Sequence, residues 1–236
     1  MFHTLFYEPI YNLLVFALTV VPLHDVGAAI ILVTCIVKGL LLPLNLSATR
    51  SQYALKKVEN EIKQIREKHK ETPQEMSKKM MEVYKRENIN PFASFFTLFI
   101  QIPIFIALYF VFSKGLHADV DSLYSFLSFP EKLHTFAFGI LDVTAKNIPI
   151  AIATGVSAYI LARRQTSTMV SKKQPHEESF QDHFMKSMKI QLLYVLPLVI
   201  AFSSAVLPAA IGLYWTTSNI LSFFQDVYIK RKYHFV

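Results

Sequence analysis

The stretch from Ile30 to Leu46, IILVTCIVKGLLLPLNL, constrains this chain most, because it is almost wholly apolar and yet carries Lys38 at its middle. A lysine at the centre of a membrane helix costs about 2.5–3.5 kcal/mol on insertion scales. Roughly two turns of apolar chain lie on either side of Lys38, so its side chain reaches the headgroups only incompletely. We therefore expect the ammonium group to face protein or water inside the bilayer. Thr34 and Asn45 lie one turn before and two turns after it, on the same side of the helix.

A structural lysine paired with a carboxylate on another span is the alternative. The sequence argues against it, because no Asp or Glu lies deep in the other apolar segments. This inventory favours a hydrated, functional cavity around Lys38.

Composition indicates a polytopic membrane protein. Of the 236 residues 53% are hydrophobic and 17% charged, whereas soluble domains carry about 25% charged residues. The single cysteine, Cys35, excludes disulfides within the chain and a cysteine-based metal site. The sequence has no GxSxG, HExxH, P-loop or dinucleotide-binding motif, so we expect neither an enzyme nor a cofactor.

Apolar and charged runs alternate along the chain and predict an all-α membrane protein with five transmembrane helices. The expected segments are an outer interfacial helix (1–25), span 1 (26–46), a cytoplasmic helical hairpin (47–90), span 2 (91–112), an outer loop with short helices (113–146), span 3 (147–162), a cytoplasmic loop (163–189), span 4 (190–206), span 5 (209–228) and a cytoplasmic tail (229–236). Together they form one integral membrane domain. A true crossing by the first segment remains an alternative, although Pro9 and Pro22 bracket a run that is short for a span.

The segment 47–90 differs sharply from its neighbours, because it holds eleven basic residues and seven glutamates. Thr72-Pro73-Gln74-Glu75 is a typical helix start, with Thr at the N-cap and Pro at the first helical position. The apolar positions that predict a seam between the two helices are Leu55, Val58, Ile62, Ile65, Met76, Met80, Val83 and Tyr84. A solvated antiparallel pair explains most of this segment, and a docking arm for chains or partners is the functional alternative.

The distribution of positive charge predicts the orientation. The hairpin, the second polar loop and the tail together hold 20 of the 24 Lys and Arg residues. The positive-inside rule then places these parts and the C-terminus in the cytoplasm and the N-terminus outside. Five crossings require the two ends to lie on opposite sides, in agreement with the charge count.

Polar side chains in the spans form a candidate groove around Lys38. Its members are Thr34, Lys38, Gln101, Ser157, Trp215, Ser218 and Asn219, and Ser222 and Gln225 extend the polar face of the fifth span. Each hydroxyl or amide alone is explained as well by a hydrogen bond between helices. Together with Lys38 they favour one hydrated groove that lowers the cost of moving polar residues into the membrane.

Three motifs resemble the YidC-type membrane protein insertases of the YidC/Oxa/Alb superfamily. They are VTCIVKGLLLPLNLSATRS (33–51), NINPFASFFTLFIQIPIFIALY (88–109) and LPAAIGLYWTTSNILSFFQ (207–225). The number of spans, their order and the charged hairpin are similar as well. This chain has Lys38 where the family usually has Arg, so the bidentate guanidinium fork is lost while the charge is kept. Leu161-Ala162 stands where many relatives have Gln-Gln.

The resemblance implies a bacterial inner or plasma membrane protein that inserts small membrane proteins and helps them fold. Its groove would open to the cytoplasm and to lipid and be closed on the outside, with Lys38 as its cation and Gln101, Trp215 and Asn219 as polar or supporting members. The partners implied are nascent membrane proteins, the lipid bilayer, the Sec translocon and the ribosome, with no direct contact to nucleic acid. Two rival functions use the same residues: an anion transporter or channel with Lys38 as its site, and a scaffold in which Lys38 contacts lipid phosphate.

Overall fold

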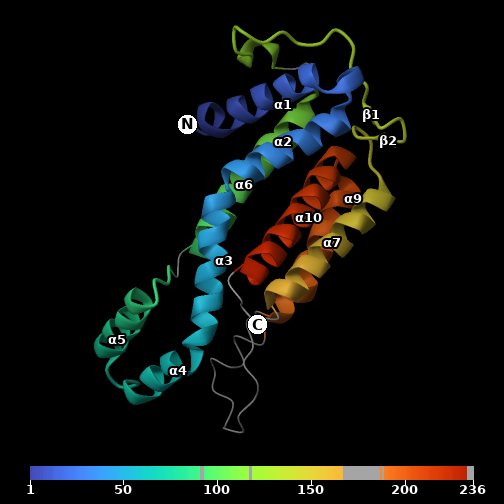
Figure 1. Ribbon diagram of the computed structural model, residues 1–236. Coiled ribbons are helices and arrows are strands. Elements are labelled where there is room, and N and C mark those ends of the chain that lie inside the picture. Colours follow the sequence, from blue (N-terminus) through green and yellow to red (C-terminus); the bar gives the residue numbers. More distant parts are fainter. Residues whose placement is uncertain (91–92, 117–118, 167–186, 188, 233–236) are drawn as a thin grey trace.

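The computed structural model describes residues 1–90, 93–116, 119–166, 187 and 189–232, with the backbone alone over 93–100. The described chain is mostly helical, as predicted. Figure 1 shows α7, α9 and α10 side by side on one flank of the molecule, with α1, α2, α6 and the outer loop at one end and a helical arm at the other. The cytoplasmic loop predicted at 163–189 lies largely outside the described residues, as does the end of the tail.

The first element crosses the ends of α2 and α6. A π-helical turn, η1 (His3–Tyr7), leads into α1 (Glu8–Val20), and a 3-10 turn, η2 (Pro22–His24), leads out of it. Tyr11, Leu14 and Leu18 of α1 are fully buried in the main apolar core, which also includes residues of α2 and α6. The 13 residues of α1 make about 20 Å of helix, which is short for a hydrocarbon layer of roughly 30 Å.

The predicted first span is divided into two helices. Asp25 caps α2 (Val26–Leu40), because its Oδ1 accepts a hydrogen bond from the Ala28 amide at 2.9 Å. The helix then breaks at Leu41, and α3 (Leu42–Lys57) continues at an angle of 60°. Pro43, in the first turn of α3, has no amide hydrogen to donate to the preceding turn, which explains the break. The helix over the predicted first span (26–46) is therefore interrupted at Leu41, and α3 continues from this span into the charged segment.

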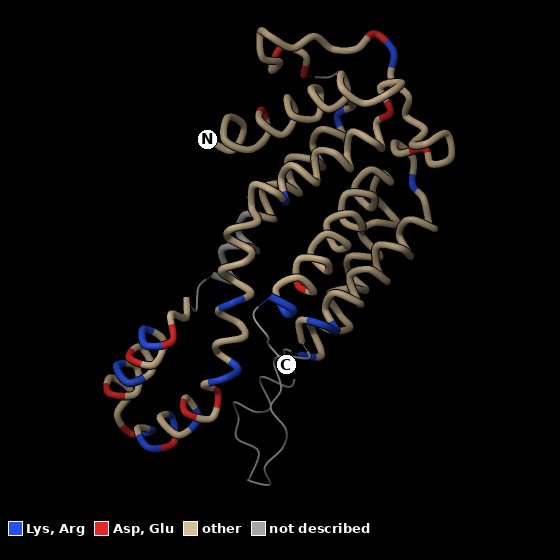
Figure 2. Tube along the Cα trace, in the orientation of Figure 1, with Lys and Arg blue, Asp and Glu red and all other residues tan. Residues whose placement is uncertain are grey.

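The charged segment forms the arm in which α3 continues into α4 (Glu59–Lys68) and α5 (Pro73–Arg86). Helix α5 begins at Pro73, as the motif predicts, although the Thr72 side chain makes no capping hydrogen bond. The seam is buried at Val58, Ile62, Val83 and Ile89, with Ala54, Leu55, Ile65, Met80 and Tyr84 packed against it; the predicted member Met76 lies outside this cluster. Both charge signs alternate along the outside of the arm (Figure 2).

The remaining helices are α6 (Ala93–Lys114), α7 (Ile148–Thr166), a π-helical turn η4 (Gln191–Val195), α9 (Leu196–Val206) and α10 (Ala209–Lys232). Both α7 and α10 extend beyond their predicted ends at 162 and 228. Pro197 lies in the first turn of α9, directly after the widened turn η4, as expected where a proline removes a helical hydrogen bond. The two-residue connection Leu207-Pro208 between α9 and α10 matches the tight turn read from the sequence.

The outer loop differs from its prediction. Instead of short helices it contains a 3-10 turn, η3 (Val120–Ser122), and a hairpin of β1 (Phe136–Ala137) and β2 (Leu141–Asp142). Its backbone groups are satisfied by the helices it covers: Asn12 of α1 donates to the Ser122 carbonyl at 2.9 Å and accepts from the Tyr124 amide at 2.7 Å. Asn12 thus satisfies backbone groups of Ser122 and Tyr124, and the Leu123 and Leu127 amides bond to carbonyls of the loop itself.

Side chains tie the same loop to η1 and to the end of α6. Tyr7 donates a hydrogen bond to Asp119, and Lys114 pairs with the same carboxylate at 3.1 Å. These two contacts, the tyrosine hydroxyl foremost, hold the pKa of Asp119 below its usual range. Tyr11 donates to the Leu116 carbonyl at 3.0 Å. The loop is therefore a cap over this end of the molecule.

On length and hydropathy, no single helix among the described residues passes as a membrane span. The bent pair of α2 and α3 passes when its two helices are taken together.

Candidate functional site

Lys38 lies in the last turn of α2, and its side chain is directed at α10. The residue is only 8% exposed. Its Nζ donates a hydrogen bond to the Ser222 hydroxyl oxygen at 3.0 Å, across the packed surfaces of α2 and α10. Within the part of the chain that the structure describes, no carboxylate forms an ion pair with Lys38. Among the described residues, the hydrogen-bond partner of the cation is thus a neutral hydroxyl.

Two polar neighbours predicted on the Lys38 side behave differently from each other. Thr34 is buried, and its hydroxyl donates to the Ile30 carbonyl of its own helix at 2.6 Å. The hydroxyl group of Thr34 therefore has a hydrogen-bond partner within its own helix, and its burial is explained without a hydrated groove. Asn45 lies beyond the bend on α3, and its buried Oδ1 has no hydrogen-bond partner among the described residues.

A second polar cluster joins α7, α9 and α10 and includes two of the predicted groove residues. Asn219 donates to the Ser157 hydroxyl at 3.1 Å, and Ser157 donates to the Thr154 carbonyl at 2.9 Å. Thr154, which the sequence analysis did not select, is fully buried, and its hydroxyl lies 3.0 Å from both the Gly212 carbonyl and the Thr216 hydroxyl. This arrangement binds helices to one another.

The remaining predicted residues either belong to α10 or, in the case of Gln101, contact it from α6. Gln101 of α6 donates to the hydroxyl of buried Tyr214, and Trp215 stacks on Phe105 with the ring centroids 4.9 Å apart. Ser218 is buried one turn before Ser222. The polar face of α10 is therefore shared among α2, α6 and α7, and Lys38 meets Ser222 alone among the candidates.

The structure adds a buried carboxylate that the groove prediction omitted. Asp226, one turn beyond Ser222 on α10, is 7% exposed. It pairs with Arg164 Nε of α7 at 2.9 Å and with Lys230 Nζ at 3.4 Å, and it accepts a hydrogen bond from the Tyr53 hydroxyl of α3 at 3.2 Å. The spacing of four residues from Ser222 to Asp226 to Lys230 is the sequence signal that could have found it. This cluster joins three helices at the end of the bundle opposite the cap.

A cavity of about 430 Å³ lies at the capped end and is lined by Leu23, His24, Glu131, Lys132 and His134. None of these is a predicted groove residue. The chemistry available at the candidate site is that of one buried ammonium and neutral hydrogen-bonding groups, and it suits electrostatic attraction.

Comparison with known proteins extends over most of the chain. Residues 18–235 match the family model described as "60Kd inner membrane protein". The chain is 31% identical over 211 residues to "Membrane protein insertase YidC" of Clostridium tetani, an alignment that covers 89% of this chain and 84% of that protein. It is 30% identical over 209 residues to the protein of the same name from Francisella philomiragia, covering 88% of this chain and 33% of that protein.

The chain therefore spans only a third of the length of the Francisella relatives. Both relatives carry the name of an insertase and not of an enzyme, consistent with the motifs missing from the sequence. The family description gives this chain a place in the inner membrane. The resemblance seen in the three sequence motifs is confirmed: the chain belongs to the 60Kd inner membrane protein family, the family of the YidC-type membrane protein insertases.

Proposed function

We propose that this chain is a membrane protein insertase that receives polar parts of a substrate in a hydrophilic groove open to the cytoplasm and to lipid. The observation that carries the proposal is the buried Lys38 ammonium held by the neutral Ser222 hydroxyl at 3.0 Å. A cation kept in an apolar segment without a counter-charge is costly and is typically functional. The relatives named as insertases support the same activity.

The proposed arrangement has five crossings: α2 with the first turns of α3, then α6, α7, η4 with α9, and α10. The arm of α4 and α5 and the end of α10 lie in the cytoplasm, and the N-terminus and the cap lie outside. The concentration of basic residues in the arm and at the end of α10 supports this orientation (Figure 2). Helix α1 then lies along the outer interface.

Lys38 would act by exchanging its hydrogen bond to Ser222 for a stronger one to a carboxylate of the incoming substrate. A charge-assisted hydrogen bond is roughly twice as strong as a neutral one, so an acidic residue of the substrate can displace the serine. The attraction is stronger than at an exposed site because Lys38 is largely buried and so less screened by bulk water. The groove would thereby offset part of the cost of carrying an acidic residue into the membrane, without nucleotide or covalent chemistry.

The proposed partners are nascent membrane proteins and lipid, with the Sec translocon and the ribosome as sources of substrate. The charged arm is the part we assign to first contact with these partners, because it extends away from the bundle (Figure 1).

The test is insertion of a short single-span substrate with an acidic translocated tail into liposomes that contain the purified protein. Lys38→Ala should reduce insertion by about tenfold or more, because about 1.4 kcal/mol is a factor of ten and an acidic residue at a helix centre costs about 2.5–3.5 kcal/mol. Lys38→Arg should retain insertion, since the charge remains.

Two variants at Ser222 sharpen this test. Ser222→Asp places a carboxylate beside the ammonium and should reduce insertion by pairing with Lys38, whereas Ser222→Asn leaves a neutral partner and should not. Lys146→Ala, an exposed lysine of the cap, is the matched control for loss of one positive charge. Equal insertion by wild type, Lys38→Ala and Ser222→Asp would refute the proposed role of the ammonium.

A further inference from the structure

The short β-hairpin of the cap exposes three large apolar side chains. Phe136, Phe138 and Ile140 are 53%, 63% and 87% exposed, respectively. Ala137, between the two phenylalanines, is fully buried against Gly27 of α2, where a Cβ atom on the glycine would overlap Ala137. One side of the hairpin is therefore packed on the protein, and its apolar tip is directed away from it.

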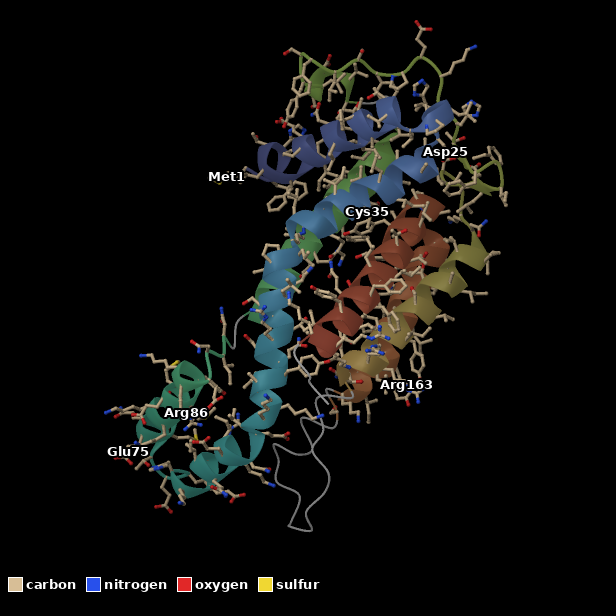
Figure 3. All side chains as sticks on the ribbon, in the orientation of Figure 1. Met1, Asp25, Cys35, Glu75, Arg86 and Arg163 are labelled. Atoms are coloured by element: carbon tan, nitrogen blue, oxygen red, sulfur yellow. The ribbon has the colours of Figure 1, made fainter. Side chains whose placement is uncertain are left out.

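The tip is held in this position by hydrogen bonds on both sides. The Phe138 amide donates to Asp25 Oδ2 at 2.6 Å, and Oδ1 of the same carboxylate caps α2; Figure 3 labels Asp25 at this junction. After the hairpin, the carbonyls of Val143 and Ala145 accept the amides of Ala210 and Ala209, each at 2.8 Å. The turn has two left-handed residues, Phe138 with φ of 52° and Gly139 with φ of 72°, and glycine takes this conformation at no steric cost. The side chains are thus exposed by a braced scaffold.

The exposed faces of α7, which begins near the hairpin, and of α9, which packs on α7, are apolar. Helix α7 exposes an apolar residue at every fourth position from its start, namely Ile148, Ile152, Val156 and Ile160. Helix α9 exposes Leu198, Val199, Phe202 and Val206. Such a surface faces lipid in an inner membrane protein. The hairpin extends sideways beside the start of α7, at the end of this surface (Figure 1).

We propose that the hairpin tip formed by Phe136, Phe138 and Ile140 inserts into the headgroup region of the outer leaflet beside α7 and anchors the cap to the bilayer. Lipid is the occupant because the tip lies beside the start of α7, whose exposed face is apolar, and its three exposed side chains carry no charge. The inference requires α7 to cross the membrane as proposed above, but it does not require insertase activity.

The single cysteine makes a depth measurement direct. Cys35→Ser removes the native thiol (labelled in Figure 3), and Ile140→Cys then receives a nitroxide label in the full chain. The protein is reconstituted in phosphatidylethanolamine–phosphatidylglycerol vesicles, and relaxation of the label by oxygen and by a water-soluble nickel chelate is compared. Ile152→Cys on α7 is the reference for hydrocarbon, and Glu131→Cys on the exposed part of the cap is the reference for water.

The ratio of oxygen to nickel relaxation at Ile140 should be several-fold higher than at Glu131 and below that at Ile152. A label at Ile140 that nickel reaches as readily as it does at Glu131 would overturn the inference. A label shielded from both reagents would also overturn it, because the tip would then contact protein. Spectral broadening by a second label would overturn it as well, because the tip would then contact a second copy of the chain. Nickel access at Ile152 would remove α7 from the bilayer, and the inference with it, whereas loss of insertion in the Lys38 assay alone would leave the depth profile unchanged.

Discussion

At the scale of single residues, three cations packed against α10 have two kinds of partner. Lys38 is held by the Ser222 hydroxyl, whereas Arg164 and Lys230 share the buried carboxylate of Asp226. Arg164 also lies over the Phe223 ring at 4.8 Å from its centroid, and Lys230 lies over Tyr53 at 5.5 Å. The first arrangement leaves a cation that a carboxylate could engage, and the second neutralises charge while joining α3, α7 and α10.

Asp226→Asn should destabilise the folded protein by about 2 kcal/mol, between the values for exposed and fully buried ion pairs, because two cations lose their counter-charge. Thermal unfolding in detergent micelles measures this loss. Asp121→Asn makes the same change at an exposed position of the cap and should leave the unfolding temperature unchanged. Equal unfolding temperatures for both variants would mean that the Asp226 cluster contributes nothing to stability.

At the scale of elements, close contacts at small residues hold α7, α9 and α10 together. A Cβ atom at Gly155 of α7 would stand 2.7 Å from the Ala201 Cβ of α9, and one at Gly212 of α10 would overlap the Ser204 hydroxyl. Small residues let helix backbones approach in membrane proteins, where lipid competes with protein for apolar contact. The hydroxyl of Thr154 then lies within reach of both neighbouring helices.

Gly212→Ala should destabilise this three-helix contact by about 1–3 kcal/mol, because the added methyl group forces α9 and α10 apart. Gly39→Ala is the matched control, since a Cβ atom there meets no described atom within 4 Å. Unfolding in detergent should separate the two variants, and adding Ser204→Ala to Gly212→Ala should recover part of the loss. An unaffected Gly212→Ala protein would contradict the close packing.

At the scale of the whole molecule, the two ends have different constructions. The end with α1 is closed by a cap whose backbone is hydrogen-bonded to α1, α2 and α10, and the opposite end bears the charged arm. In the proposed orientation the capped end lies outside and the charged arm lies in the cytoplasm, where a substrate would first be met.

This polarity predicts the result of thiol labelling in intact cells that carry the Cys35→Ser background. Thr144→Cys, in the exposed part of the cap, should react with a membrane-impermeant maleimide added outside. Ser77→Cys, on the arm helix α5, should react only after the cells are permeabilised. The reverse pattern would mean that the orientation is opposite to the one proposed. Labelling of both cysteines from outside would contradict the placement of the arm in the cytoplasm.

The sequence by itself determined those features that depend on local chemistry. Residue types and their spacing predict three such features: the start of α5 at Pro73, the turn at Leu207-Pro208 and the apolar seam of the arm. The three motifs were enough to indicate the family. A helix start, a turn residue or an apolar period acts over a few neighbouring residues, so it can be read without knowing the fold.

Only the tertiary structure decided which polar groups meet. Periodicity places Asn219 and Ser222 on one face of α10. It does not reveal that Asn219 contacts Ser157 of α7, or that Ser222 contacts Lys38 of α2, 184 residues away. Asp226 has partners on α3 and α7 that the spacing along α10 does not reveal, and the hydrogen bonds that join the cap to α1 and α10 link residues far apart in the sequence. A residue pattern specifies the face of a helix, whereas the neighbour against that face depends on how all the helices pack together.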